Sequence, residues 1–132
     1  MALGSEIDET ALFPKSYREF IALYQAGEYW HAHEVLEHLW RVTIDQDRRN
    51  FFHGMIQLAA AFVHVKRGNM TGANRLLIKA AAKFESVPSP YLGVNLIELR
   101  SDVGVAARYV RTLVDYSTCH FDWIYKPQVK FM

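Results

Sequence analysis

The stretch of this 132-residue sequence with the most chemical potential is GEYWHAHEVLEHLW, residues 27–40, which holds three histidines and three glutamates. Four of its residues are spaced so that they share one face of a helix: Trp30, His33, Glu37 and Trp40. We expect this face to be buried, because a large apolar side chain gains about 1.5–3 kcal/mol on leaving water. The other polar residues should face solvent, namely His31, His38 and Arg41.

A second polar stripe follows in FFHGMIQLAAAFVHVK, residues 51–66, where three polar side chains interrupt an apolar segment. One helical face collects His53, Gln57, Ala60 and His64. An unpaired buried carboxylate costs several kcal/mol, so Glu37 needs partners, and an antiparallel neighbouring helix would supply them. The predicted pocket between the two helices, with the tryptophans as its walls, consists of Trp30, His33, Glu34, Glu37, Trp40, His53, Gln57 and His64.

Three interpretations of this polar cluster remain open. In the first, the cluster is a structural network in which histidine and glutamine satisfy a buried glutamate. In the second, it is a metal site with His33, Glu37 and His64 as ligands, a donor set that suits zinc, iron or manganese. In the third, it is an acid–base or ligand-binding pocket, with catalytic candidates Glu34, Glu37 and His33. HEVLE is not the H-E-x-x-H motif of metalloproteases, because the fourth position after His33 holds glutamate. The sequence requires no cofactor, and a divalent metal is the one that these residues would accept.

Helix start and stop signals divide the chain into five segments. The first begins with Pro14 and a Ser16 to Glu19 capping pair, and Gly27 ends it. Prolines in VPSP stop the fourth, and Asn95 caps the fifth. The expected helices cover residues 14–26, 29–42, 47–67, 70–85 and 95–116. No strand pattern accompanies them, so the fold class is all-α.

AGEYWHAHEVL (26–36) and RGNMTGANRLL (67–77) form a faint internal repeat with an offset of 41 residues. In each copy a helix ends at glycine, and the next helix carries alanine where the two must approach closely. This is the logic of a tetratricopeptide-like helical hairpin. We therefore expect a compact orthogonal or up-down bundle of about five helices that contains two such hairpins.

Composition and charge exclude several classes of function. The net charge is +1 and the basic residues are scattered, so no nucleic-acid partner is predicted. The longest apolar run is too short to span a bilayer, and the N-terminal residues do not resemble a secretion signal. The single cysteine excludes an intrachain disulfide. We expect a cytoplasmic protein with no membrane partner.

The segment CHFDWIYKPQVKFM, residues 119–132, is rich in aromatic and apolar side chains. Burial of such a surface is favourable, so we expect it either to wrap over the bundle or to form a contact between subunits of a homo-oligomer. We expect residues 1–132 to form one helical domain, with a core over 13–116 and an aromatic tail over 117–132.

Three ordered blocks of the sequence resemble domain of unknown function family 309. They are GEYWHAHEVLEHLW, FFHGMIQLAAAFVHVKRGNMTGANRLL and YLGVNLIEL, which together extend over about residues 20–99. The signature positions of the family fall on His33, Glu34, Glu37, Trp40, Gly54, Gln57, Gly68, Asn69, Gly72 and Ala73. His53 stands where the family more often has glutamine, a departure that favours a ligand role at this position. The resemblance implies a compact all-α fold and no defined activity.

The function predicted from the sequence is therefore that of an uncharacterised helical-bundle protein whose polar cluster is structural or binds a ligand. One alternative is a metal-assisted or acid–base hydrolytic enzyme that uses the same cluster. The other is a tetratricopeptide-like interaction module that binds a partner through its groove or its aromatic tail.

Overall fold

The computed structural model describes residues 13–132, and these residues form an all-α bundle. Its helices are α2 (Lys15–Gln25), α3 (Tyr29–Val42), α4 (Gln46–Lys66), α5 (Met70–Glu85) and α6 (Leu96–Asp115). A short 3-10 helix, η1 (Trp123–Tyr125), lies in the tail. The described residues contain no strand, and one isolated bridge pairs Tyr91 with Val94. None of the described helices is long and apolar enough to cross a membrane.

The helix boundaries follow the local signals in the sequence closely. α3 and α5 begin and end at the predicted residues, and Asn95 caps α6 by accepting a hydrogen bond from the Glu98 backbone N–H at 3.1 Å. The predicted cap of α2 is wrong. Pro14 is the N-cap residue, and Ser16 lies inside the helix. Proline fixes a backbone angle suited to a helix start, so a serine cap two residues later is not needed.

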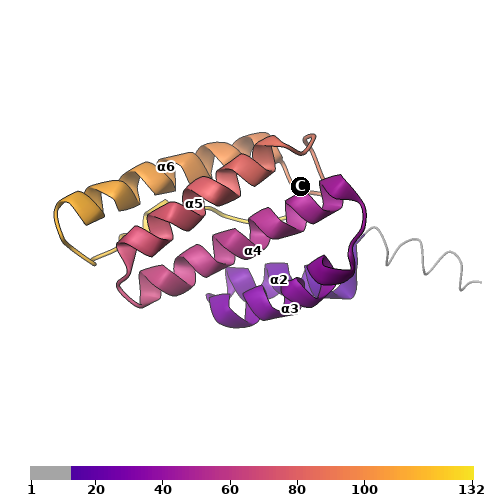
Figure 1. Cartoon of the computed structure of the whole chain (residues 1–132), viewed down its shortest axis with the longest axis horizontal. Coiled ribbons are helices and arrows are strands. Elements are labelled where there is room, and N and C mark those ends of the chain that lie inside the picture. The colour runs from indigo at the N-terminus through magenta and orange to yellow at the C-terminus, as the bar shows by residue number, and fades with distance from the viewer. Residues whose placement is uncertain (1–12) are drawn as a thin grey trace, which may run out of the picture.

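Each helix packs chiefly against the next helix in the chain. Figure 1 shows α4, α5 and α6 side by side, with α2 and α3 along the other flank of α4. α4 is therefore the most enclosed helix, and eleven of its 21 residues are buried. Close packing explains Gly54, where an added Cβ would lie 2.7 Å from the Phe84 ring of α5.

The two helical hairpins share one turn geometry. α2 and α4 both end at a glycine in the left-handed region, Gly27 with φ 79° and Gly68 with φ 75°. In both turns the closing N–H donates to the carbonyl five residues back, from Glu28 to Leu23 and from Asn69 to His64, at 2.9 Å. The residues that follow are buried in matching pairs: Tyr29 and Met70, Ala32 and Ala73, Leu36 and Leu77. The repeat in the sequence thus has a structural counterpart.

The aromatic tail (residues 117–132) wraps back over the bundle, which was one of its two predicted placements. From the end of α6 it returns along the bundle, as the yellow trace behind α5 in Figure 1 shows. Its last described residue is tied to the loop before α6, because the Met132 N–H donates to the Gly93 carbonyl at 2.7 Å.

Candidate functional site

The buried face of α3 differs from the predicted one. Ala32 and Leu36 are completely buried, whereas Trp30 is 52% exposed. Alanine allows the α3 backbone to approach its neighbours, and Trp30 lies about 200° around the helix from Ala32, so it faces outward. The Trp30 ring stacks on His33, with a centroid distance of 5.4 Å, and lies 5.9 Å from the Arg67 guanidinium. The prediction that Trp30 is a buried wall is therefore wrong.

Glu37 finds its partners on its own helix. Its carboxylate lies 3.2 Å from His33 Nε2 and accepts a hydrogen bond from Arg41 Nη2 at 2.5 Å. The Glu37 side chain is 29% exposed. Arg41 was predicted to face solvent, and it does so while reaching back to Glu37. Glu34, a catalytic candidate, is exposed. Within residues 13–132, no hydrogen bond joins Glu37 to the stripe on α4, so the expectation that this stripe would supply its partners is wrong.

The polar residues at the two ends of the stripe on α4 contact different partners. At one end, His53 packs against Trp40 with ring centroids 4.8 Å apart. Arg49 covers the same indole at 4.7 Å and donates to the Trp40 carbonyl at 3.0 Å. At the other end, His64 Nδ1 lies 3.1 Å from the Asn69 side-chain amide in the turn to α5. His64 therefore supports a turn and does not reach the carboxylate of Glu37.

The metal site predicted from His33, Glu37 and His64 is not assembled. Among the residues that the structure describes, no group of three or more His, Cys, Asp or Glu side chains is placed to hold a metal ion. The positive charges around His53 also oppose a bound metal ion. Burial lowers the pKa of His53, and the nearby cations Lys83, Arg49 and Lys79 lower it further, so His53 is neutral at neutral pH.

One part of the predicted cluster remains buried and polar. Trp40 meets His53 and Trp30 meets Arg67, so α3 and α4 are antiparallel and Glu37 lies level with Gln57. Gln57 is the one buried polar residue among residues 13–132. Its Oε1 atom and the Nδ1 atom of His33 are buried without a hydrogen-bond partner in the protein. This arrangement fits a structural or ligand-binding role better than a catalytic one.

A second candidate site is the groove that the aromatic tail fills. The Tyr24 hydroxyl donates to the Pro127 carbonyl at 2.8 Å, and Gln25 Nε2 donates to the Val129 carbonyl, also at 2.8 Å. Burial raises the pKa of Tyr24 well above its usual value, so the phenol keeps the proton that it donates. α2 thus holds two backbone carbonyls, two residues apart, of an extended segment.

Aromatic contacts from several helices fix the side chains of the tail. The Trp123 ring stacks on Tyr29 of α3 at 6.2 Å with the planes 2° apart, and the Phe62 ring of α4 lies 5.9 Å from it. Tyr109 of α6 stacks on Tyr125 at 3.9 Å. Near the end of the tail, Phe131 meets Tyr17 of α2 edge-on at 5.8 Å. Side chains from α2, α3, α4 and α6 therefore contact the tail along its length, and we call the surface that they form the groove.

Lys126 lies in a cage at the centre of this groove. Its Nζ atom is 4.7 Å from the Tyr24 ring centroid and 5.0 Å from that of Tyr29, and it donates to the Tyr24 carbonyl at 3.0 Å. No ion pair joins Lys126 to a carboxylate in the described part of the chain. Burial, and then the nearby Lys66 ammonium, lower the pKa of Lys126. Aromatic faces and one carbonyl thus hold this cation.

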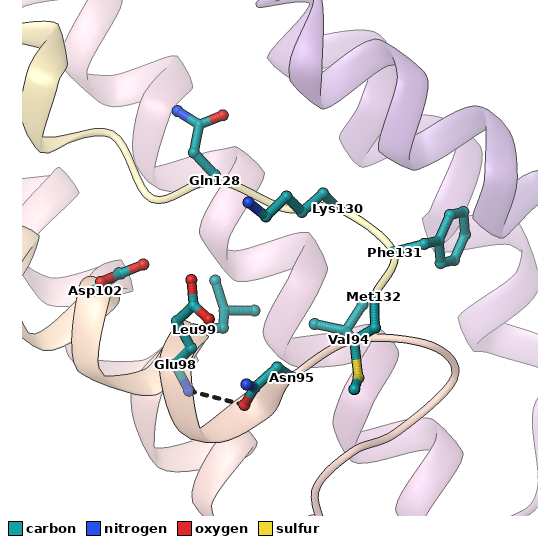
Figure 2. A pocket seen from close by; sticks show the side chains of 9 residues that line it. All are labelled: Val94, Asn95, Glu98, Leu99, Asp102, Gln128, Lys130, Phe131 and Met132. Carbon is teal, nitrogen blue, oxygen red and sulfur yellow. Dashed lines mark hydrogen bonds between the residues drawn. The ribbon is translucent and has the colours of Figure 1, made fainter.

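The end of the tail, residues 128–132, packs less closely on the start of α6 than on α2. A pocket of about 120 Å³ separates the end of the tail from the start of α6. Figure 2 shows Glu98 and Asp102 of α6 on one side of this pocket and Gln128 and Lys130 of the tail on the other. A second hollow of about 410 Å³ lies beside Ile124 to Gln128. The end of the tail is therefore held more closely by α2 than by α6, whereas Tyr109 of α6 contacts the tail further back, at Phe121 and Tyr125.

The sequence reasoning did not identify the groove residues Tyr24, Gln25, Tyr29 and Lys66. Two signals were available. Tyr17 and Tyr24 stand seven positions apart on the buried face of α2, where a phenol requires an acceptor. The tail also places a lysine inside an aromatic run, WIYKP, which suits an aromatic cage. Neither signal specifies which residues meet.

Fold and groove together define the class of protein: an all-helical hairpin-repeat domain whose groove holds an extended segment. The sequence model of domain of unknown function family 309 (DUF309) matches residues 17–76, and the predicted resemblance to this family is confirmed over that part of the chain. The matched residues extend from α2 into α5 and include the first copy of the repeat and all but the last residue of the second. The aromatic tail lies outside them.

Two curated relatives are similar to the same part of the chain. The uncharacterized protein YpuF of Bacillus subtilis (strain 168) is 36% identical over 67 residues, which make up 50% of this chain and 38% of that protein. An uncharacterized protein of Aquifex aeolicus (strain VF5) is 27% identical over 78 residues, 59% of this chain and 23% of that protein. The chain thus matches well under half the length of either relative, and neither name states an activity.

Proposed function

We propose that this domain is a binding module for extended polypeptide segments and that its own aromatic tail fills the binding groove. The observation that carries the proposal is the pair of hydrogen bonds from Tyr24 and Gln25 to the carbonyls of Pro127 and Val129. Hydrogen bonds to backbone carbonyls tolerate many sequences, because the backbone atoms are the same in every residue. Neighbouring side-chain pockets then provide selectivity.

The cage around Lys126 is the main selective element of the groove. Each cation–π contact contributes about 0.5–1 kcal/mol at an exposed site and about 2 kcal/mol or more when water is excluded. Lys126 makes two such contacts and one hydrogen bond to a carbonyl. The aromatic positions on either side of it, Trp123 and Phe131, add apolar area. The groove therefore suits a segment with a central lysine flanked by aromatic residues.

The proposal also includes the expectations from the sequence about domain organisation, location in the cell and the enzyme alternative. A single domain with a core over 13–116 and a tail over 117–132 is the unit that we propose binds its partner. Scattered basic residues and one exposed cysteine, Cys119, support a cytoplasmic protein without a nucleic-acid partner. The enzyme alternative has less support, because Glu34 is exposed and Glu37 is paired with His33 and Arg41.

Cutting the chain between α6 and the tail tests the proposal directly. A protease site placed at residues 116–119, of which all but Thr118 are exposed, and cleaved in the folded protein turns residues 120–132 into a separate peptide. We expect a fluorescent peptide of the same sequence to bind the cut protein with saturation, measured by anisotropy. A peptide with Lys126→Met should bind at least tenfold more weakly, and a scrambled peptide should not bind.

Native-state hydrogen exchange of the uncut chain provides an independent measurement. A groove that releases its occupant requires the tail to open without unfolding of the helices. The amide of Asp122, which donates to the Tyr109 hydroxyl at 2.8 Å, should therefore exchange at least a hundredfold faster than the amides in the centre of α4. Equal exchange free energies for the tail and α4, or no binding by a cut protein that remains helical, would refute the proposal.

A further inference from the structure

α6 ends with the same motif as α2 and α4, but without a glycine. The Thr118 N–H donates to the Leu113 carbonyl at 3.0 Å, and the left-handed position is taken by Ser117, with φ 53°. The corresponding positions in the two hairpins hold Gly27 and Gly68. Residues other than glycine are disfavoured in the left-handed region, because their Cβ atom approaches the backbone oxygen. The turn that sends the tail back into its own groove is therefore strained at Ser117.

Residues 116–120 form an exposed connection between α6 and the tail. The Tyr116 side chain is 82% exposed, and Cys119 is exposed too. The ring contacts that hold the tail begin beyond this connection, with Phe121 against Tyr109 at 5.4 Å. Within it, the Tyr109 hydroxyl makes one long hydrogen bond to the His120 carbonyl, at 3.5 Å. The connection can therefore straighten without the loss of any ring contact or hydrogen bond between the tail and α2.

We propose that a second copy of this chain donates its aromatic tail to the groove, so that two chains form a tail-exchanged dimer with a hinge at residues 116–120. This inference rests on the proposed function, because it needs a groove that releases one tail and accepts another. The groove contacts are the same in the closed monomer and in the exchanged dimer, so they favour neither form. The balance is set by the hinge and by the chain concentration.

Straightening the hinge takes Ser117 out of the left-handed region and removes the strain. The usual penalty for a non-glycine residue there corresponds to about fivefold or more in an equilibrium constant. Because a dimer contains two hinges, this contribution should favour the dimer about 25-fold or more relative to a chain with glycine at this position. Both chains keep the occupied groove, including the Lys126 cage.

Three full-length variants test this inference. Ser117→Gly removes the strain of the closed turn and should lower the dimerisation constant about 25-fold, from the estimate above. Ser117→Pro excludes a positive φ and removes the N–H that donates to the Val114 carbonyl at 3.1 Å, so it should raise the dimer fraction. Ser86→Gly is the matched control. Ser86 follows α5 with φ −80°, and its replacement should leave the dimerisation constant unchanged.

Light scattering after size exclusion gives the mass of each species over a range of chain concentrations, and hydrogen exchange reports on residues 121–131 of each species. Dimers that increase in the order Ser117→Gly, wild type, Ser117→Pro, with the tail still protected, support the exchange. Monomers in all variants with a protected tail would overturn the exchange and leave the groove proposal standing. Dimers with an unprotected tail would overturn the exchange and also count against the groove.

Discussion

The replacement Tyr24→Phe removes one oxygen atom from the groove and leaves its shape unchanged. The Tyr24 ring is fully buried, and its hydroxyl donates to the Pro127 carbonyl at 2.8 Å. Pro127 is buried as well, so its carbonyl loses a donor that water does not readily replace. A buried polar group left without its partner costs about 1–3 kcal/mol. We expect the free energy of tail docking to fall by this amount.

Tyr17→Phe is the matched control for this prediction. The Tyr17 hydroxyl is also buried, and it donates to the Leu92 carbonyl at 2.9 Å, outside the tail. Both variants remove one buried phenol-to-carbonyl bond from α2. Because the tail is docked in the native state, the loss of 1–3 kcal/mol should lower the melting temperature by roughly 3–12 °C in each variant, as expected for a domain of this size.

Hydrogen exchange of the tail distinguishes the two variants. In Tyr24→Phe the open population of residues 121–131 should rise by about 5- to 150-fold, the factor that corresponds to 1–3 kcal/mol. In Tyr17→Phe, exchange in the tail should change much less than exchange near Leu92. Equal acceleration of the tail in both variants would show that the Tyr24 bond does not hold the tail and would refute the reasoning.

Three further predictions concern the helices. The pKa of His53 is lowered in the folded protein, so His53 contributes stability that is present above about pH 6.5 and is lost as the pH falls below it. His53→Gln should flatten this dependence in urea titrations at pH 5–7, and an unchanged slope would contradict the assignment. Gly54→Ala should destabilise the fold by about 1–3 kcal/mol because the new methyl meets the Phe84 ring, whereas Gly104→Ala, with its nearest neighbour at 3.6 Å, should stabilise it by about 0.5–1 kcal/mol. Glu37→Ala should cost about 1 kcal/mol or less in chemical denaturation, since both partners lie one turn away on the same half-exposed helix, and a loss above about 3 kcal/mol would restore a buried network.

Helix positions were readable from the sequence because the signals that set them are local. The glycines at 27 and 68 and the prolines of VPSP mark helix ends within a few residues. α3 and α5 accordingly begin and end where predicted. The Ser16 cap failed for a local reason too, since Pro14 already serves as the N-cap residue.

The candidate site was only partly readable, because periodicity shows which residues share a helical face and not which face meets a neighbour. Trp30 and Glu37 do share a face, yet the close approach at Ala32 turned that face toward the flank of the bundle. His64 was aligned with Gln57 correctly but is engaged by Asn69 in the next turn. The groove depends on contacts between residues more than 100 positions apart, for which the sequence carries no local signal.

The same separation has a consequence for the order of folding. Within the body, each helix packs chiefly on its successor, a pattern of low contact order that favours fast folding. The hydrogen bonds between α2 and the tail close loops of 102 to 104 residues, and closing such long loops costs conformational entropy. We therefore expect these bonds to form after the helices have packed. During synthesis α2 to α6 leave the ribosome before the tail does. A chain whose helices have assembled therefore presents an open groove until its tail docks, and we expect any segment that competes with the tail to have its best opportunity in that interval.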